Sequence, residues 1–213
     1  MKISKLSCIG LLFLVFFSFS IFIESNPVAA TSIGEWKFDE GTGLLANDSS
    51  GRGKTGRLWG AVQWVDGIIN KALQFNGSTD YVQVAPSIQD LTSWSFTAYV
   101  KPTGNQGAEQ YVYSERDVNG DVYFYICLTS DRRVKVATRH HLRAGQLNNH
   151  SAWDIYQTDK NVITSGDWNY LMITFNGGSI TPDTGTVKCY INGRKVGEGK
   201  LGPSTKTPLD VKF

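Results

Sequence analysis

The sequence lacks any run of basic residues. Its 21 Lys and Arg stand against 19 Asp and Glu, which leaves a formal net charge of +2 over 213 residues. A surface that binds nucleic acid needs a basic stripe to neutralise successive phosphates, so the composition argues against nucleic acid as a partner. Apolar residues at helical spacing are also scarce, which argues against a helical domain.

Cysteine is scarce as well, with Cys8, Cys127 and Cys189. The last two lie in apolar, strand-like runs and are either bridged or free, because a bridge requires Cα atoms within about 7 Å of each other. The sequence has no Ser, His and Asp in an arrangement typical of a catalytic triad, and no thiol–imidazole pair. No pattern therefore indicates a nucleophilic active site.

The amino terminus has the layout of a secretory signal peptide. Lys2 and Lys5 precede an apolar run over 6–23, and small residues follow up to Ala30. We expect cleavage after Ala30, which leaves one domain over 31–213, secreted or at the cell surface and without a transmembrane span. The alternative is a retained membrane anchor, because the run approaches the length of a bilayer span.

From residue 33 onward, short runs rich in Val, Ile, Tyr, Phe and Trp alternate with clusters of Gly, Asn, Asp and Pro. This pattern predicts antiparallel strands in a sandwich, and Asn-Gly pairs at 119, 176 and 192 predict tight turns. The polar stretch 140–164 is long for a hairpin connection and is predicted to be a functional loop. The predicted strands are 34–38, 57–59, 72–75, 81–84, 95–101, 110–114, 122–129, 133–139, 168–176 and 186–191.

Five blocks in the same order resemble the laminin-G-like domains of the concanavalin-A-like lectin/glucanase superfamily. The resemblance implies an all-β, two-sheet antiparallel jelly roll, often calcium-bearing, that binds carbohydrate or protein outside the cell. It also implies that another strand and then a closing segment follow the 187–193 block, with the last strand paired to the first, so we expect the domain 31–213 to lack its last strand. The blocks are WKFDEGTG with DSSG (36–51), ALQFNG with DYV (72–82), SFT with VKP (95–102), 168–177 and 187–193.

One hairpin turn carries a candidate calcium site. Asp117, Asn119 and Asp121 alternate, so their oxygens suit a hard cation that takes six to eight oxygen ligands. The alternative is an ordinary solvated turn. The acids at 39–40 together with Asp48 are a second candidate ion site, although Asp48 in Asp-Ser-Ser-Gly is favoured as a turn cap.

The predicted ligand-binding residues are Arg139, His140, His141, Trp153 and Tyr156. Sugars stack their apolar faces on aromatic rings, while charged groups bind their hydroxyls. The alternative is that Trp153 and Tyr156 pin a long loop to the sheet.

Catalysis is the least favoured function. The glucanases of the superfamily place carboxylates at alternate positions of one strand, and hydrolysis needs two of them across the scissile bond. Glu115 and Asp117 have this parity, but no second glutamate follows. We therefore predict a non-catalytic binding module for carbohydrate or a surface glycoconjugate. The alternatives are a protein-adhesion module, whose partner is an extracellular protein, and a glycoside hydrolase.

Overall fold

The computed structural model of the chain describes residues 11–20, 32–84, 93–103, 107–116, 122–139, 153–177 and 185–201. These residues form fifteen strands and no helix, so the part of the chain that the structure describes has no helix fit to cross a bilayer. The predicted all-β class is confirmed.

The largest sheet has eight strands, all paired antiparallel, in the order β15-β14-β13-β8-β1-β6-β5, with β2 paired to β1 beside this path. Burial alternates strictly along β13 and β14, because one face covers the core and the other faces solvent. The strands are β1 (Leu11–Ser20), β2 (Ser32–Trp36), β5 (Gln63–Asp66), β6 (Lys71–Phe75), β8 (Ser93–Thr103), β13 (Asn169–Asn176), β14 (Gly185–Ile191) and β15 (Arg194–Leu201).

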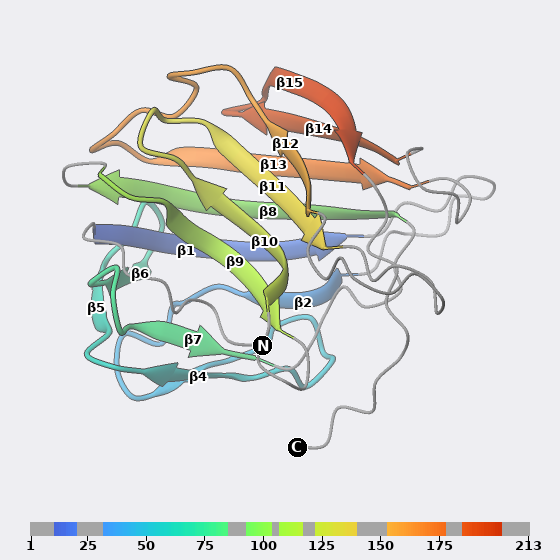
Figure 1. The fold of residues 1–213 in the computed structure, drawn as a ribbon. Coiled ribbons are helices and arrows are strands. Elements are labelled where there is room, and N and C mark those ends of the chain that lie inside the picture. The colour runs from blue at the N-terminus through green and yellow to red at the C-terminus, as the bar shows by residue number, and fades with distance from the viewer. Residues whose placement is uncertain are drawn as a thin grey trace.

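A four-stranded sheet in the order β12-β11-β10-β9 lies against the large sheet, and the three strands β3-β4-β7 form a separate small sheet at one end (Figure 1). The four-stranded sheet consists of β9 (Gln110–Arg116), β10 (Val122–Leu128), β11 (Val134–Arg139) and β12 (Trp153–Gln157). The small sheet consists of β3 (Leu45–Ala46), β4 (Gly56–Trp59) and β7 (Tyr81–Gln83).

The main core lies between the eight-stranded and four-stranded sheets. Phe96 of β8 meets Tyr113 of β9 edge to face at 5.6 Å, and Trp94 of β8 meets Phe124 of β10 in the same way at 5.4 Å. Full burial of a large apolar side chain contributes about 1.5–3 kcal/mol, so these contacts hold the two sheets together. The predicted jelly-roll sandwich is confirmed.

The predicted Asn192–Gly193 turn is also confirmed. Both residues have positive φ, 51° and 80°, and the turn joins Ile191 of β14 to Arg194 of β15. Asn and Gly are the residues that adopt this backbone conformation most readily in a two-residue hairpin.

The segment Leu11–Ser20, which the sequence predicts to be part of a signal peptide, forms strand β1. It pairs with β8 along its length and with β2 and β6 on its other side. A cleaved signal peptide cannot also be a strand of the mature domain, so a chain cleaved after Ala30 would lack strand β1 and its pairing with β8. Cleavage after Ala30 stays a prediction.

Cys127 and Cys189 are both buried, and no disulfide bridge joins them in this structure. Cys189 lies in the main core, whereas Cys127 packs on the other face of the four-stranded sheet. Burial raises the pKa of the Cys189 thiol to about 12.

Candidate functional site on the four-stranded sheet

The four-stranded sheet has an inner face against the core and an outer face turned away from it. Two β-bulges decide which side chains point to each face. At the first, Ile126 pairs with Tyr113 and Cys127 with Tyr111, so β9 carries one extra residue and Tyr111 points outward while Tyr113 points inward. The second lies between Val122 and Phe124 of β10.

Three aromatic rings from three strands form a continuous strip on the outer face. Tyr111 of β9 and Tyr125 of β10 have ring centroids 5.2 Å apart, and Tyr125 and Trp153 of β12 are also 5.2 Å apart. The rings are tilted by 58° and 57°, and they pack over Cys127 and Ala137. We call these three residues the aromatic strip.

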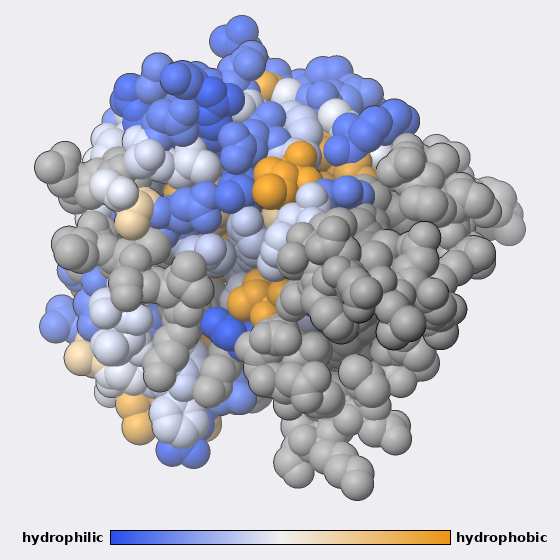
Figure 2. All heavy atoms as spheres, viewed as in Figure 1, coloured by the Kyte–Doolittle hydropathy of each residue, from blue (hydrophilic) through white to orange (hydrophobic). Residues whose placement is uncertain are grey.

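The strip is buried in the middle and partly accessible to solvent at its two ends. Tyr125 in the middle is 8% exposed, while Tyr111 and Trp153 at its ends are half-buried. Nearby, Ile155 of β12 is 49% exposed. Figure 2 shows hydrophobic side chains at the surface over these strands, bordered by hydrophilic ones.

An ion pair lies beside the strip. Lys135 Nζ of β11 is 2.7 Å from Glu109 Oε1 and 5.5 Å from the centre of the Tyr125 ring. The Tyr111 hydroxyl donates to Glu109 Oε2 at 3.3 Å. The strip thus carries two phenolic hydroxyls of its own and has a cation and a carboxylate beside it.

The electrostatics of these groups follow from their burial. Burial raises the pKa of Tyr111 and of Tyr125 above the ordinary value for tyrosine. Burial by itself lowers the pKa of Lys135, but its hydrogen bonds with Glu109 and Tyr125 outweigh that effect and raise it. At neutral pH the face therefore presents an ammonium group and neutral phenols.

The inner face holds a different cluster. Glu115 is 1% exposed, and it accepts a hydrogen bond from the Tyr113 hydroxyl at 2.5 Å and another from the Tyr123 hydroxyl. The extra residue of the second bulge is Tyr123, which turns it inward beside Phe124. The Glu115 carboxylate therefore lies in the interior of the fold, closed off from solvent.

The structure separates the predicted ligand residues. The register pairs Arg139, the last residue of β11, with Trp153 of β12, so these two positions are neighbours on the sheet. His140 and His141 follow directly and lie outside the described residues.

Tyr156 points to the opposite face from Trp153. It is 8% exposed and belongs to the main core, where its ring lies against Gly197 and Gly199 of β15. A Cβ atom at either glycine would come within 2.4 Å of the Tyr156 side chain. This contact matches the alternative prediction that Tyr156 pins its segment to the sheet.

The predicted calcium residues Asp117, Asn119 and Asp121 all lie outside the described residues. Within the described ranges no group of three or more His, Cys, Asp or Glu is arranged to hold a metal ion.

In the second candidate ion site Asp48 is a cap, as favoured from the sequence. Asp48 Oδ1 accepts from the backbone N–H groups of Glu35 and Ser50, and Oδ2 accepts from that of Lys54. Burial opposes the change, yet these hydrogen bonds lower the pKa of Asp48 to about 2.

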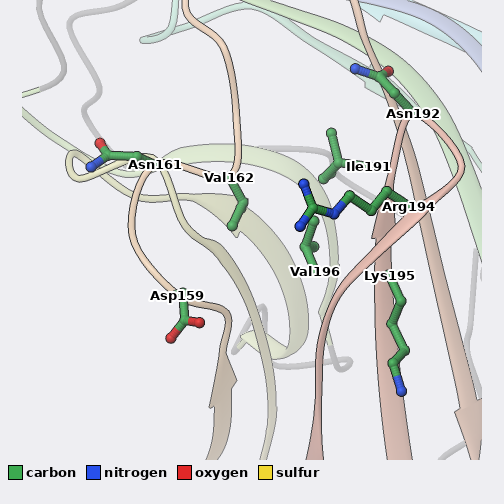
Figure 3. A pocket seen from close by; sticks show the side chains of 8 residues that line it. All are labelled: Asp159, Asn161, Val162, Ile191, Asn192, Arg194, Lys195 and Val196. Carbon is green, nitrogen blue, oxygen red and sulfur yellow. The ribbon is translucent and has the colours of Figure 1, made fainter.

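A separate surface hollow of about 600 Å³ lies between the segment after β12 and the β14–β15 hairpin (Figure 3). Val162, Ile191 and Val196 supply its apolar lining, and the Arg194 side chain extends across it toward Val162. Among the described residues that line it, none has an aromatic ring. For a ligand that binds by stacking, the aromatic strip is therefore the better site.

Sequence reasoning missed Tyr111, Tyr125, Lys135 and Glu109. The alternation of side chains along β10 and β11 places Tyr125, Cys127, Lys135 and Ala137 on one face. This parity was a usable signal. The bulge that turns Tyr111 to the same face left no signal in the sequence.

The profile of a laminin G family, described as the concanavalin A-like lectin/glucanases superfamily, matches residues 76–212. The chain is also similar to the crystal structure of the binding domain of Paraclostridial Mosquitocidal Protein 1, with a TM-score of 0.52 and 20% sequence identity. That match covers 90% of this chain and 42% of the other, so the chain spans less than half the length of that structure. At this identity the likeness shows the fold alone. No curated protein matches the chain.

Proposed function

Because this chain belongs to the concanavalin A-like lectin/glucanase superfamily, we propose that it is a non-catalytic module that binds carbohydrate through the outer face of its four-stranded sheet. The observation that carries the proposal is the aromatic strip of Tyr111, Tyr125 and Trp153. Tyrosine and tryptophan combine an apolar ring with a polar O–H or N–H group. They therefore suit ligands that have both apolar and polar surfaces.

The groups around the strip support saccharide binding. Binding sites combine an apolar surface with a few fixed polar groups that orient the ligand. Here the Lys135 ammonium and the Glu109 carboxylate hold each other in place, and both touch a tyrosine of the strip. A saccharide that lies along the strip therefore meets a donor and an acceptor for its hydroxyls at the end of the strip where Tyr111 lies.

The register places a further candidate residue at the Trp153 end of the strip. Arg139 is the register neighbour of Trp153, and His140 and His141 follow it in the chain. We include these three residues in the proposed site as additional hydrogen-bonding groups.

A binding role is favoured over hydrolysis by the position of Glu115. A glycosidase needs two carboxylates exposed on either side of the scissile bond. Glu115, the carboxylate with the parity expected of a glucanase, is 1% exposed and bound by two tyrosine hydroxyls. Its position supports a structural function for this residue.

Secretion and calcium binding belong to the same proposal and rest on the sequence. The apolar run over 6–23 supports export, and the alternating oxygens of Asp117, Asn119 and Asp121 support a calcium ion at that turn. Calorimetric titration with calcium chloride tests the ion site. Calcium binding that persists in a chain with Asp117→Asn and Asp121→Asn would contradict it.

The main test is a glycan array with and without calcium, followed by calorimetry with the best saccharide. We expect Trp153→Ala to weaken saccharide binding roughly tenfold or more, because loss of a well-packed anchor residue typically costs at least that much. Trp59→Ser is the matched control, because Trp59 lies on β4, outside the four-stranded sheet, and is 40% exposed.

The outcome has two clear readings. Saccharide binding that Trp153→Ala abolishes and Trp59→Ser leaves intact supports the proposal. An array without any bound saccharide, or equal losses in both variants, overturns it.

A further inference from the structure

A second exposed surface lies on the small sheet, far from the aromatic strip along the chain. Alternate residues of β3, β4 and β7 point outward, while Ala46, Gly56, Leu58 and Val82 between them are buried. The outward-facing set, with the adjoining Leu44, comprises Leu44, Leu45, Arg57, Trp59, Tyr81 and Gln83. We call this set the β4 patch.

The β4 patch is unusually apolar for solvent-exposed surface. Leu44 is 62% exposed, Leu45 is 53% exposed and Trp59 is 40% exposed. The described part of the chain has six exposed large hydrophobic side chains, and three of them are in this patch. Isolated exposed apolar residues are ordinary, but a contiguous group of them marks an interaction site.

The patch is held in a fixed shape. The register pairs Trp59 with Tyr81, and the two rings lie nearly parallel with centroids 6.1 Å apart. The Arg57 guanidinium lies 4.9 Å from the centre of the Trp59 ring.

The exposed leucines lie on a fastened segment. Leu58 N–H donates to the Leu44 carbonyl at 2.9 Å, and Trp64 Nε1 donates to the Gly43 carbonyl at 3.0 Å. Because these surface residues are already fixed in place, binding of a partner costs little free energy for ordering them.

The residue types point to a protein partner. Trp, Tyr and Arg are the side chains that dominate the binding energy of protein interfaces. Aliphatic side chains such as Leu44 and Leu45 complement apolar side chains of a partner. Among the described residues Arg57 forms no ion pair, so its charge is available to an incoming carboxylate.

We propose that the β4 patch is a docking surface for a protein segment that places an acidic side chain on Arg57 and apolar side chains on Leu44, Leu45 and Trp59. This interaction is independent of the proposed saccharide site, because the patch and the aromatic strip share no residue. The chain then has two binding surfaces, one for a saccharide and one for a polypeptide.

The test uses the full chain and a panel of short fluorescein-labelled peptides. Half of the peptides carry Asp or Glu beside Leu or Ile, and each has a partner peptide in which Lys replaces the acid. Fluorescence anisotropy measures binding. We expect the acidic peptides to bind and their lysine partners to bind roughly tenfold more weakly or not at all, because Arg57 repels an ammonium.

Substitutions in the chain identify the surface. Trp59→Ser and Arg57→Gln should each weaken binding of the acidic peptides roughly tenfold, while Trp153→Ala should leave it unchanged. Both substituted side chains are exposed, and thermal unfolding of each variant verifies that the fold is intact. Absence of peptide binding, or peptide binding that survives Trp59→Ser, overturns the proposal. Saccharide binding that is lost on Trp59→Ser would overturn the choice of a polypeptide.

Discussion

The inner and outer faces of the four-stranded sheet are built from the same kinds of side chain and use them differently. On the inner face Glu115 accepts hydrogen bonds from Tyr113 and Tyr123 and is shielded from solvent. On the outer face Glu109 meets Tyr111 and Lys135 and is one-third exposed. Tyrosine and glutamate thus stabilise the fold on the inner face, where they are buried. On the outer face, where they are partly exposed to solvent, they form a candidate binding site.

The largest contrast is expected in the two glutamates. Glu115→Leu should lower the free energy of unfolding by about 3 kcal/mol, because two buried tyrosine hydroxyls lose their acceptor. Glu109→Leu should lower it by about 1 kcal/mol, because its ion pair is partly exposed and weakened by solvent. Urea unfolding measures both values. Equal losses of unfolding free energy in the two variants would contradict the difference in burial between Glu115 and Glu109.

A second contrast concerns Lys135, whose side chain is 13% exposed. Lys135→Met keeps the aliphatic stem over Tyr125 and removes the charge. We expect a loss of about 1 kcal/mol in unfolding free energy, together with weaker saccharide binding. Lys200→Met on β15 removes an exposed charge away from this face and is the control. The idea fails if both variants bind the saccharide equally well.

Alkaline pH should destabilise the fold through the buried phenols of both faces. Burial raises the pKa of Tyr156 on the inner face from 10.0 to about 12, and it raises the pKa of Tyr111 and Tyr125 on the outer face. A raised folded-state pKa gives stability that is complete below the unfolded value and is lost as pH rises through the folded value.

The free energy of unfolding should therefore begin to fall above pH 10 and continue to fall toward about pH 12. Tyr156→Phe, and the double variant Tyr111→Phe with Tyr125→Phe, should each make this fall shallower. Denaturant unfolding over this pH range measures the effect. A fall of the same steepness in all three proteins would contradict it.

The smallest effect is expected in thiol reactivity. Cys127 lies under the aromatic strip and Cys189 lies in the main core, and both are fully buried. In a chain with Cys8→Ser, both thiols should react slowly with a disulfide reagent. Trp153→Ala should speed the reaction of Cys127 alone, because it opens only the outer face. Faster labelling of Cys189 would show that the variant loosens the whole domain.

Much of the fold follows from local pattern. Each of the ten predicted strands overlaps an observed strand, because alternation and Asn-Gly turns are short-range signals. Arg194–Leu201 was missed because its charges and glycines depress strand propensity, and Trp153–Gln157 was missed because it follows a polar stretch. Both strands are held by pairing with a neighbour that a local pattern does not reveal.

The candidate site was predictable only in part. The sequence indicates Trp153 because sugars stack on aromatic rings, and the structure places Arg139 beside it in the register. Tyr156 was grouped with them because it is near Trp153 in the chain, but it has the opposite parity on β12 and meets the glycines of β15. Proximity in sequence does not place two strand residues on the same face.

The sequence by itself determined that this protein is a β-sandwich of short strands, and the order of its blocks determined the superfamily. Both depend on interactions between residues close in the chain, such as period-two burial and turns with positive φ. Only the tertiary structure decided that Tyr111, Tyr125 and Trp153 form one strip and that Glu115 is sealed in the interior. Those outcomes depend on strand register and on two bulges, which are set by how distant segments pack against each other.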